Sequence, residues 1–243
     1  MQINISDTYD DMCQQVLAHL SLLTSNLTNP LICPASGSTP EGLYKQMVTL
    51  ANSNLLDVAT WDFVGLDEWL GMNETDEGSC RQSLDQQFFE PLQITENRIC
   101  FFDGRATDPQ GECEKVEAFI NQHAGIDIAI VGLGTNGHVA MNEPGTNALL
   151  RSHISNIAPE TQAVGQKYFS SPKKITQGIT LGIATLMESR HILMMVNGIK
   201  KAAIVKEMLT IPVSEELPAT LFRDHPGLHI YLDKEAASYL QTS

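Results

Sequence analysis

The sequence lacks a long apolar run, paired cysteines and a basic excess, and each absence excludes a class of protein. No stretch approaches the roughly 18 apolar residues of a membrane span, and MQINISDTYDDM lacks the basic start and apolar core of a secretion signal. The five cysteines, at positions 13, 33, 80, 100 and 113, form no C-x-x-C pair, so we expect reduced, mostly buried thiols. These absences predict a cytoplasmic protein.

Basic residues are also few. The chain has 15 Lys and Arg against 29 Asp and Glu, a formal net charge of −14. This balance argues against nucleic acid or an anionic membrane as a partner. A phosphorylated metabolite is still compatible with it, provided that a local cluster of donors neutralises the phosphate.

What the sequence does contain is an alternation of strand-like and helix-like segments. Apolar runs predict strands at 30–36, 58–65, 126–134, 179–184, 191–198 and 229–233. Helical spacing or capping signals predict helices at 9–23, 38–52, 79–89, 108–123 and 198–209, with a short helix after 233. This order predicts an α/β fold with a parallel sheet between helices, in one domain over 1–243. Ligands in such folds bind at the carboxyl ends of the strands.

The stretch VGLGTNGHVAMNEPG, residues 131–145, contains the G-x-G-x-x-G spacing of a dinucleotide-binding fingerprint. That fingerprint requires a long helix after its third glycine and an acid about 20 residues further on. Here Pro144 interrupts any such helix, position 157 is isoleucine, and the nearest acid is Glu160. We therefore expect a loop, and neither a nicotinamide nor a flavin site.

A better phosphate cradle is ASGSTP, residues 35–40, between a predicted strand and a predicted helix. Gly37 permits an unusual turn, Ser38 and Thr39 supply hydroxyls, and the free N–H groups at a helix start favour an anion. The alternative is a plain turn in which Thr39 caps the helix and Pro40 is its first residue. Composition alone does not separate the two.

A second sign of an anion is the pair Lys200 and Lys201 in the first turn of a predicted helix. The helix dipole disfavours cations there by roughly 0.3–1 kcal/mol each. One of them reaching a bound anion would explain this position, and the alternative is two solvated lysines.

Acids and a histidine follow two other strands. Asp67 and Glu68 form a carboxylate pair suited to general base work, or else two surface acids in a loop. His138 lies five positions before Glu143, which could orient or tune the imidazole, although an isolated histidine is more often structural. The histidines of HPGLH, residues 225–229, are separated by helix-breaking residues and have no third ligand in view, so we expect no metal site.

Taken in order, these segments resemble the glucosamine-6-phosphate deaminase/isomerase family over about residues 30 to 205. The resemblance rests on ASGSTPEGLYK, LDEWLGM, GLGTNGHVAMNEPG and ITLGIATLMESRHILMMVNGIKKAA. Within the family, the segments HIS (153–155), GITLG and PATLF are most similar to the galactosamine-6-phosphate isomerase branch.

The resemblance implies a three-layer α/β/α sandwich with a Rossmann-like, mostly parallel sheet. It implies conversion of galactosamine 6-phosphate or glucosamine 6-phosphate, as a small-molecule partner, to a ketose 6-phosphate and ammonia, with no cofactor. Asp67 matches the base that moves a proton between C2 and C1, His138 the acid/base that opens the ring, and Glu143 its carboxylate partner. The positions that match the phosphate site are Gly37, Ser38, Thr39 and Lys201. Residues 151–178 match a lid segment, and longer relatives suggest a homo-oligomer.

Two departures from the family pattern bear on the site. Asn136 stands where the family usually has aspartate, so the neighbour of His138 is uncharged and should favour the imidazolium less. Lys167 stands where the family has a phosphate-binding arginine, which keeps the charge but loses the bidentate fork.

Two other classes share this kind of fold. The 6-phosphogluconolactonases have a similar Gly-His loop, but they carry Asp-Glu-Arg where this chain has Asp67-Glu68-Trp69 and lack Asn-Glu-Pro after the histidine. Sugar-phosphate sensor domains bind without catalysis and usually carry a DNA-binding domain, which the acidic sequence does not suggest.

Overall fold

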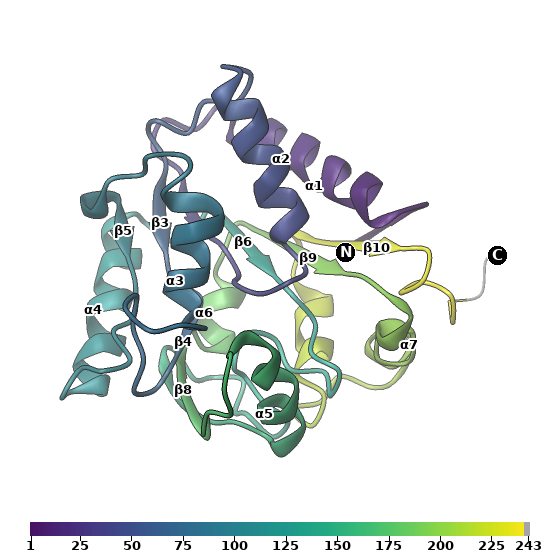
Figure 1. The fold of residues 1–243 in the computed structure, drawn as a ribbon. Helices are drawn as coiled ribbons and strands as arrows, with labels where there is room; N and C mark the ends of the chain where they lie inside the picture. Colours follow the sequence, from purple (N-terminus) through teal and green to yellow (C-terminus); the bar gives the residue numbers. More distant parts are fainter. Residues whose placement is uncertain (241–243) are drawn as a thin grey trace.

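Two β-sheets form the framework of the computed structural model, which describes residues 1–240 (Figure 1). The larger sheet is parallel throughout, in the order β1-β10-β9-β6-β2-β3-β5. Its strands are β1 (Gln2–Ser6), β2 (Leu31–Cys33), β3 (Asp62–Val64), β5 (Ile99–Cys100), β6 (Ile128–Val131), β9 (His191–Val196) and β10 (Leu228–Asp233). The smaller, antiparallel sheet has the order β4 (Asp67–Trp69), β8 (Gln177–Thr180), β7 (His153–Asn156).

Helices cover both faces of the larger sheet. On one face α1 (Tyr9–Thr24), α2 (Glu41–Asn52) and α3 (Cys80–Leu84) share one apolar cluster. On the other face α4 (Pro109–Gln122), α6 (Ile183–Met187) and α7 (Ala202–Thr210) share a second cluster. The remaining α-helix of residues 1–240, α5 (Pro159–Gly165), lies near the small sheet (Figure 1). The predicted α/β sandwich with a mostly parallel sheet is confirmed.

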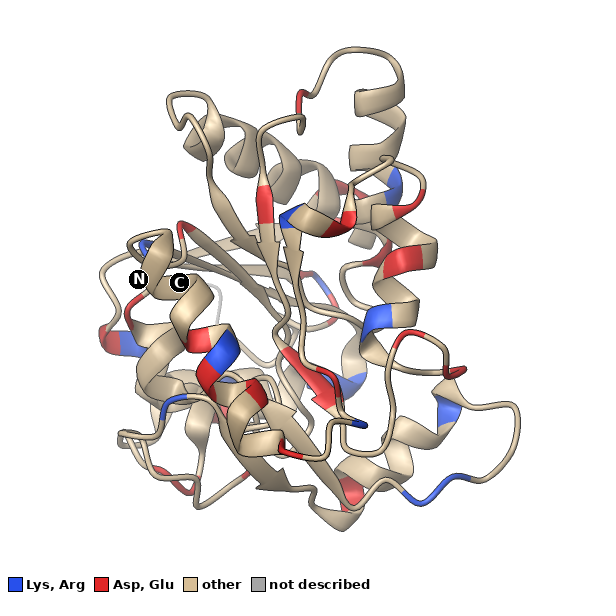
Figure 2. Ribbon diagram, turned by 90° about the vertical axis from the view of Figure 1, so that its left-hand side faces the viewer, with Lys and Arg blue, Asp and Glu red and all other residues tan. Residues whose placement is uncertain are grey.

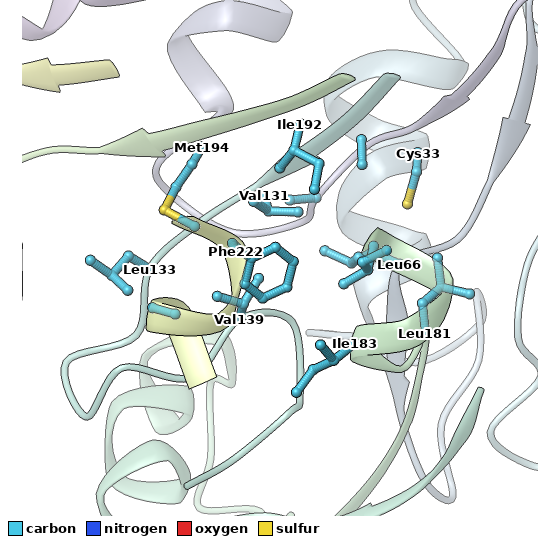
Figure 3. Packing of buried hydrophobic residues seen from close by; sticks show 14 of the residues in the cluster. Cys33, Leu66, Val131, Leu133, Val139, Leu181, Ile183, Ile192, Met194 and Phe222 are labelled. Atoms are coloured by element: carbon cyan, nitrogen blue, oxygen red, sulfur yellow. The ribbon is translucent and has the colours of Figure 1, made fainter. Parts of the chain in front are cut away.

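The central strands are apolar on both sides because each side meets a helical layer. In β9, Ile192 and Met194 belong to the cluster with α4, α6 and α7, whereas Leu193 and Met195 belong to the cluster with α1 and α2. Figure 3 shows Ile192 and Met194 beside Val131 in the first of these clusters. Because all the strands of this sheet run parallel, their carboxyl ends lie together at one edge.

Two predicted elements near the small sheet were wrong. The run 179–184 is not one strand: β8 ends at Thr180, and α6 begins at Ile183. Gly182 allows this change of direction, since a Cβ there would lie 2.1 Å from the carbonyl oxygens of Leu150 and Arg151. Asp67 and Glu68, expected in a loop, belong to strand β4. Strands β1, β5 and β7 were not predicted either.

The helix predicted at 38–52 begins at Glu41, and Thr39 does not cap it. The phenol of Tyr9 in α1 substitutes for a cap: it accepts a hydrogen bond from the Gly42 N–H and donates one to the Thr39 carbonyl, both at 2.8 Å. The Thr39 hydroxyl instead donates to Asn197 Oδ1 at 3.0 Å. Thr39 is thus free of the helix and faces the sheet edge.

Other helix ends follow their sequence signals. Asp108 caps α4 through the Gly111 N–H, and Ser79 caps α3 through the Gln82 N–H, as predicted. The helix predicted to reach Phe89 is α-helical only to Leu84 and continues as a π turn. After β10, residues 234–240 form turns rather than the expected helix.

Charged residues of both signs are dispersed over the elements, and the basic residues lie scattered among the more numerous acidic ones (Figure 2). Within residues 1–240, every helix is too short or too polar to cross a bilayer. A local gathering of cations would therefore stand out against this background.

Candidate active site

Four polar segments meet at the carboxyl edge of the parallel sheet, where β2, β3, β6 and β9 end. Thr39 after β2 bonds Asn197 after β9, and the Lys201 ammonium bonds the Leu133 carbonyl after β6. The small sheet brings Asp67 to the same edge, since Asp67 pairs with Thr180 in β8. The segments singled out in the sequence are therefore neighbours.

Asp67 is an ionisable group held out of water at this edge of the sheet. Its side chain is buried, and burial raises its pKa to about 7, an effect that the thiol of Cys80 moderates and the charge of Glu68 reinforces. A carboxylate with such a pKa exchanges protons near neutral pH, which is the property of a general base.

Glu68 has a different role from its neighbour. Its carboxylate is fully buried and accepts hydrogen bonds from the backbone N–H groups of Trp69, Cys80 and Arg81 and from the Ser79 hydroxyl, at 2.8 to 3.0 Å. Apart from the Trp69 N–H, these are donors at the start of α3, so Glu68 closes that helix end against β4. Asp67 alone of the pair is available for chemistry.

His138, Asn136 and Glu143 form a connected group in the loop after β6. The Asn136 amide donates to Glu143 Oε2 at 2.7 Å, and its oxygen lies 2.7 Å from His138 Nδ1. Because a carboxylate only accepts, the amide oxygen must face the imidazole, and Nδ1 must carry the hydrogen. The lone pair of the neutral ring is then on Nε2, the nitrogen left for a substrate.

The electrostatics of His138 favour the neutral ring. Burial lowers its pKa, the charge of Glu143 opposes this effect from 3.6 Å, and the charge of Lys201 adds to it. The expectation that Asn136 favours the imidazolium less than an aspartate is consistent with this direction. Glu143 is itself buried, and its Oε1 has no hydrogen-bond partner among residues 1–240.

The glycines of the loop shape it around the histidine. A Cβ on Gly134 would lie 2.3 Å from the His138 ring, so the ring lies flat against the loop backbone there. Gly137 has a φ of +85°, and a Cβ on it would lie 2.2 Å from the Leu217 side chain. These requirements account for the second and third glycines of the fingerprint-like spacing without a dinucleotide.

The segment 35–40 has the geometry of an anion cradle. Gly37 has a φ of +98°, which favours glycine, and the Ser38 hydroxyl accepts a hydrogen bond from the Lys167 ammonium at 3.1 Å. Lys167 comes from the 3-10 turn that follows α5, so a distant segment supplies a cation to this loop. The hydroxyl of the next residue, Tyr168, lies against Gly37. It is 2.9 Å from the position that a Cβ on Gly37 would take.

Lys201 supplies a second cation at the cradle, whereas Lys200 is exposed. Burial, and to a smaller extent the charge of Lys167, lowers the pKa of Lys201 to about 8. Two ammonium groups that repel each other, next to the Ser38 hydroxyl and a glycine turn of positive φ, suit a dianion such as phosphate. The Lys201 ammonium donates to the Leu133 carbonyl, and its other N–H donors are left for such an anion.

Three residues at the site carried no local signal in the sequence. Thr161 in α5 lies 3.2 Å from His138 Nδ1, the Tyr168 hydroxyl lies against Gly37, and Cys80 contacts Asp67. A cavity of about 350 Å³ adjoins the cradle and is lined by Gly37, Trp69, Cys80 and Tyr168 among others. Each contact joins segments far apart in the sequence.

His225 of the HPGLH segment serves the fold. His225 Nε2 donates to the Ser189 carbonyl at 2.8 Å, and its Nδ1 accepts from the Gly227 N–H at 3.1 Å. Residues 1–240 contain no group of three or more His, Cys, Asp and Glu side chains arranged to hold a metal ion.

A family model and curated proteins match nearly the whole chain. The family model for glucosamine-6-phosphate isomerases/6-phosphogluconolactonase matches residues 5–230. Glucosamine-6-phosphate deaminase 1 of Bacillus subtilis (strain 168) is 31% identical over 243 residues, covering 98% of this chain and 99% of that protein. The glucosamine-6-phosphate deaminase of Geobacillus sp. (strain WCH70) is 31% identical over 239 residues, covering 98% and 95%.

Solved structures agree with the sequence comparisons. A structure described as a monomeric glucosamine-6-phosphate deaminase matches with a TM-score of 0.95 at 29% identity, covering 98% of this chain and 100% of that one. The 6-phosphogluconolactonase from Trypanosoma brucei matches with a TM-score of 0.77 at 20% identity, covering 99% and 98%, and shares the fold.

Proposed function

The chain belongs to the family of glucosamine-6-phosphate isomerases and 6-phosphogluconolactonases, and on that premise we propose that it is an amino-sugar-6-phosphate isomerase and deaminase. Its substrate is a 2-amino-2-deoxyhexose 6-phosphate, and its products are a ketose 6-phosphate and ammonia. The observation that carries the proposal is the buried carboxyl of Asp67, whose pKa of about 7 suits a base that both takes and returns a proton.

Binding begins at the phosphate. Ser38, Thr39 and the backbone around Gly37 receive the phosphate oxygens, with Lys201 and Lys167 as counter-charges. Phosphate affinity then holds the sugar so that its C1 and C2 face Asp67 and its ring oxygen faces His138. Such anchoring lowers the entropic cost of the later proton transfers.

Ring opening comes next. His138 Nε2 takes the proton of the C1 hydroxyl and returns one to the ring oxygen, so that the bond between C1 and the ring oxygen breaks and C1 becomes an aldehyde. The imidazolium formed in between is stabilised by the Asn136 oxygen at Nδ1 and by the Glu143 carboxylate nearby.

Proton transfer follows on the open chain. Asp67 removes the proton on C2, the 2-ammonium group of the sugar gives a proton to the C1 carbonyl oxygen, and an enolamine forms. Asp67 returns its proton to C1, which gives a C2 iminium. Water adds to C2 and the nitrogen leaves as ammonia, so that a C2 ketone results. The residues assign no step to a metal or an organic cofactor.

Residues 151–178 act as a lid in this proposal, within a single domain. The segment carries Thr161 against His138, Lys167 against Ser38, and Ser170 bonded to Glu77 on the far side of the site, at 2.6 Å. These contacts describe a closed arrangement. Opening of the segment would admit the sugar and release the products.

The choice between sugar epimers is the finer part of the proposal. The curated relatives are named for glucosamine 6-phosphate, whereas HIS and PATLF resemble the galactosamine branch. In the structure, Ala219 of PATLF supports the loop by donating from its N–H to the Gly137 carbonyl at 3.0 Å, and His153 Nδ1 donates to the Arg151 carbonyl. We propose galactosamine 6-phosphate as the preferred substrate on the sequence likeness, and glucosamine 6-phosphate as the competitor.

One assay tests the proposed activity and the choice between the two amino sugars. The protein is incubated with galactosamine 6-phosphate, glucosamine 6-phosphate and 6-phosphogluconolactone, and ammonia, ketose phosphate and lactone hydrolysis are measured. Release of ammonia from one amino sugar supports the proposal, and kcat/KM decides the preferred epimer. Absence of ammonia from both sugars refutes it, and hydrolysis of the lactone alone replaces it with the lactonase activity.

The Asp67→Asn variant tests the role of the base. General acid–base catalysis contributes about 10²–10⁴-fold, so turnover should fall by that factor while the substrate still binds. Unchanged turnover would refute the assignment. Light scattering of the same preparation tests the expected homo-oligomer.

A further inference from the structure

The imidazole of His138 has two oxygen neighbours at the same nitrogen. Asn136 Oδ1 lies 2.7 Å from Nδ1, and Thr161 Oγ1 lies 3.2 Å from it. Asn136 belongs to the same loop as His138 and stays beside it. Thr161 belongs to α5, 23 positions further along the chain, and reaches the ring across the site.

The direction of these hydrogen bonds follows from Glu143. The Asn136 amide nitrogen donates to the Glu143 carboxylate, so its oxygen accepts from the Nδ1 hydrogen of His138. Thr161 Oγ1 is consequently a second acceptor for the same N–H. The threonine hydroxyl has no acceptor for its own hydrogen among residues 1–240 and keeps that hydrogen for the cleft.

The position of Thr161 depends on the segment that carries it. Six residues after Thr161, Lys167 binds the Ser38 hydroxyl at 3.1 Å, and Tyr168 places its hydroxyl against Gly37. The cradle and the imidazole are therefore contacted by one short stretch, 161–168. A phosphate in the cradle would attract Lys167 and so hold Thr161 beside His138.

We propose that Thr161 is a positioning residue that couples occupation of the phosphate cradle to the tautomer and orientation of His138. The coupling rests on the proposed function. With α5 in place, Nδ1–H has two acceptors, so the tautomer with a free Nε2 is favoured and the ring cannot rotate. With α5 withdrawn, Asn136 alone holds the ring, and the competing tautomer gains population.

The same contact acts on the charged ring. An imidazolium N–H is a stronger donor than a neutral one, so a second acceptor stabilises the protonated state formed during ring opening. The carboxylate of Glu143 favours that state, and the ammonium of Lys201 and burial disfavour it. Thr161 therefore acts in the direction of Glu143, without adding a charge.

The kinetic test compares Thr161→Val, Thr161→Ser and Val164→Thr with the wild-type protein on the preferred amino sugar. Val164 is exposed on the same helix, so Val164→Thr adds a hydroxyl away from the site as a matched control. Thr161→Val should lower kcat about fivefold, as expected for one neutral hydrogen bond lost in the transition state, with KM changed less than twofold. Thr161→Ser should restore kcat, and Val164→Thr should leave it unchanged.

The pKa of His138, followed by NMR titration, adds a readout that a purely structural role would not move. It should be lower in Thr161→Val than in wild type, because the imidazolium has lost an acceptor. Equal kcat and an equal His138 pKa in Thr161→Val and wild type would overturn the proposal. A loss that Thr161→Ser does not restore would do the same.

An NMR comparison separates this proposal from the activity itself. The nitrogen shifts of His138 report its tautomer in the free protein and with inorganic phosphate added. Wild type should show hydrogen on Nδ1, more fully with phosphate, and Thr161→Val should show a mixture that phosphate does not change. Identical spectra for the two proteins would overturn the coupling. If wild type releases no ammonia, the proposed function fails, and these spectra still decide the role of Thr161.

Discussion

The Asn136 amide donates a hydrogen bond to the Glu143 carboxylate at 2.7 Å and so places a neutral group between that carboxylate and His138. Glu143 Oε2 remains 3.6 Å from Nδ1, close enough for its charge to act on the ring without a direct hydrogen bond. Burial lowers the pKa of His138, and Glu143 opposes the effect. Asn136 therefore fixes the tautomer while it limits how basic the imidazole becomes.

Replacement of Asn136 with aspartate should raise the pKa of His138 relative to wild type, because a charge then accepts directly from Nδ1–H. Two carboxylates would also lie within hydrogen-bonding distance, so one of them should hold a proton at neutral pH. NMR titration of His138 measures the change. Asn147→Asp, an exposed position with the same change of charge, is the control and should leave that pKa unmoved. A lower pKa in Asn136→Asp would contradict this account.

The raised pKa of Asp67 should determine the acidic limb of the pH–activity profile. It should also lower the stability of the folded protein at higher pH, where the buried carboxyl is ionised. As the base, it must be ionised, so kcat/KM should fall as the pH drops below about 7. Its folded-state pKa lies above its usual value of 3.8, so the stability that its protonated form supplies is present below about pH 4 and is lost as the pH rises through about 7.

The variant Asp67→Asn cannot ionise and should therefore be more stable than wild type at pH 8, by about 2–4 kcal/mol, and similar to it near pH 4. Urea denaturation at both pH values measures the difference. A stability difference that does not change with pH would show that the carboxyl is ionised as easily in the folded protein as in the unfolded chain.

The parts of the fold predicted from sequence were those with local causes. Asp108 followed by Pro109 marks the start of α4 because cap and first residue act within one turn. The start of α2 was wrong because its cap is the phenol of Tyr9, about thirty positions earlier. Strand β4 was read as a loop because its partner, β8, lies more than a hundred residues away and carries the other half of the hydrogen bonds.

The residues of the candidate site also fall into two groups, those predicted from local sequence and those that only the structure identifies. His138, Asn136 and Glu143 were predicted because they lie within eight residues of one loop, and the structure joins them. Asp67 was predicted as a member of an acid pair, but only the structure distinguishes it from Glu68, which caps α3. Thr161 was not predicted, since no spacing links a threonine in α5 to a histidine 23 positions earlier.

Lys201 should make substrate binding weaken in alkaline solution. Its pKa is lowered to about 8, so its charge, and with it the attraction for phosphate, is lost as the pH rises above that value. KM should therefore rise between pH 7.5 and 9.5, limits chosen to bracket a pKa of about 8. Lys201→Arg stays charged over this range and should show a flat KM, whereas Lys200→Arg, at an exposed position, should behave as wild type. A flat KM in wild type would contradict the assignment.

Glu117 should control stability in acid by holding β7 and α6 to α4. Its carboxylate accepts from the Ser152 N–H and hydroxyl, the Thr185 hydroxyl and the Arg151 guanidinium, at 2.6 to 2.9 Å. Burial alone would raise its pKa, but these hydrogen bonds outweigh burial and lower it. The stability that the ionised form contributes is thus present above the unfolded pKa, about 4.3, and is lost as the pH falls through the lower folded value.

Glu117→Gln should cost about 1–3 kcal/mol at pH 7, because a charged acceptor is lost from several buried donors, and the cost should shrink as the pH falls below about 4. Urea midpoints across this range measure it. Glu188→Gln removes the exposed partner of the same Arg151 and should cost at most about 0.5 kcal/mol at either pH. Equal costs for the two variants at pH 7 would mean that the buried hydrogen bonds of Glu117 contribute no more than a surface ion pair.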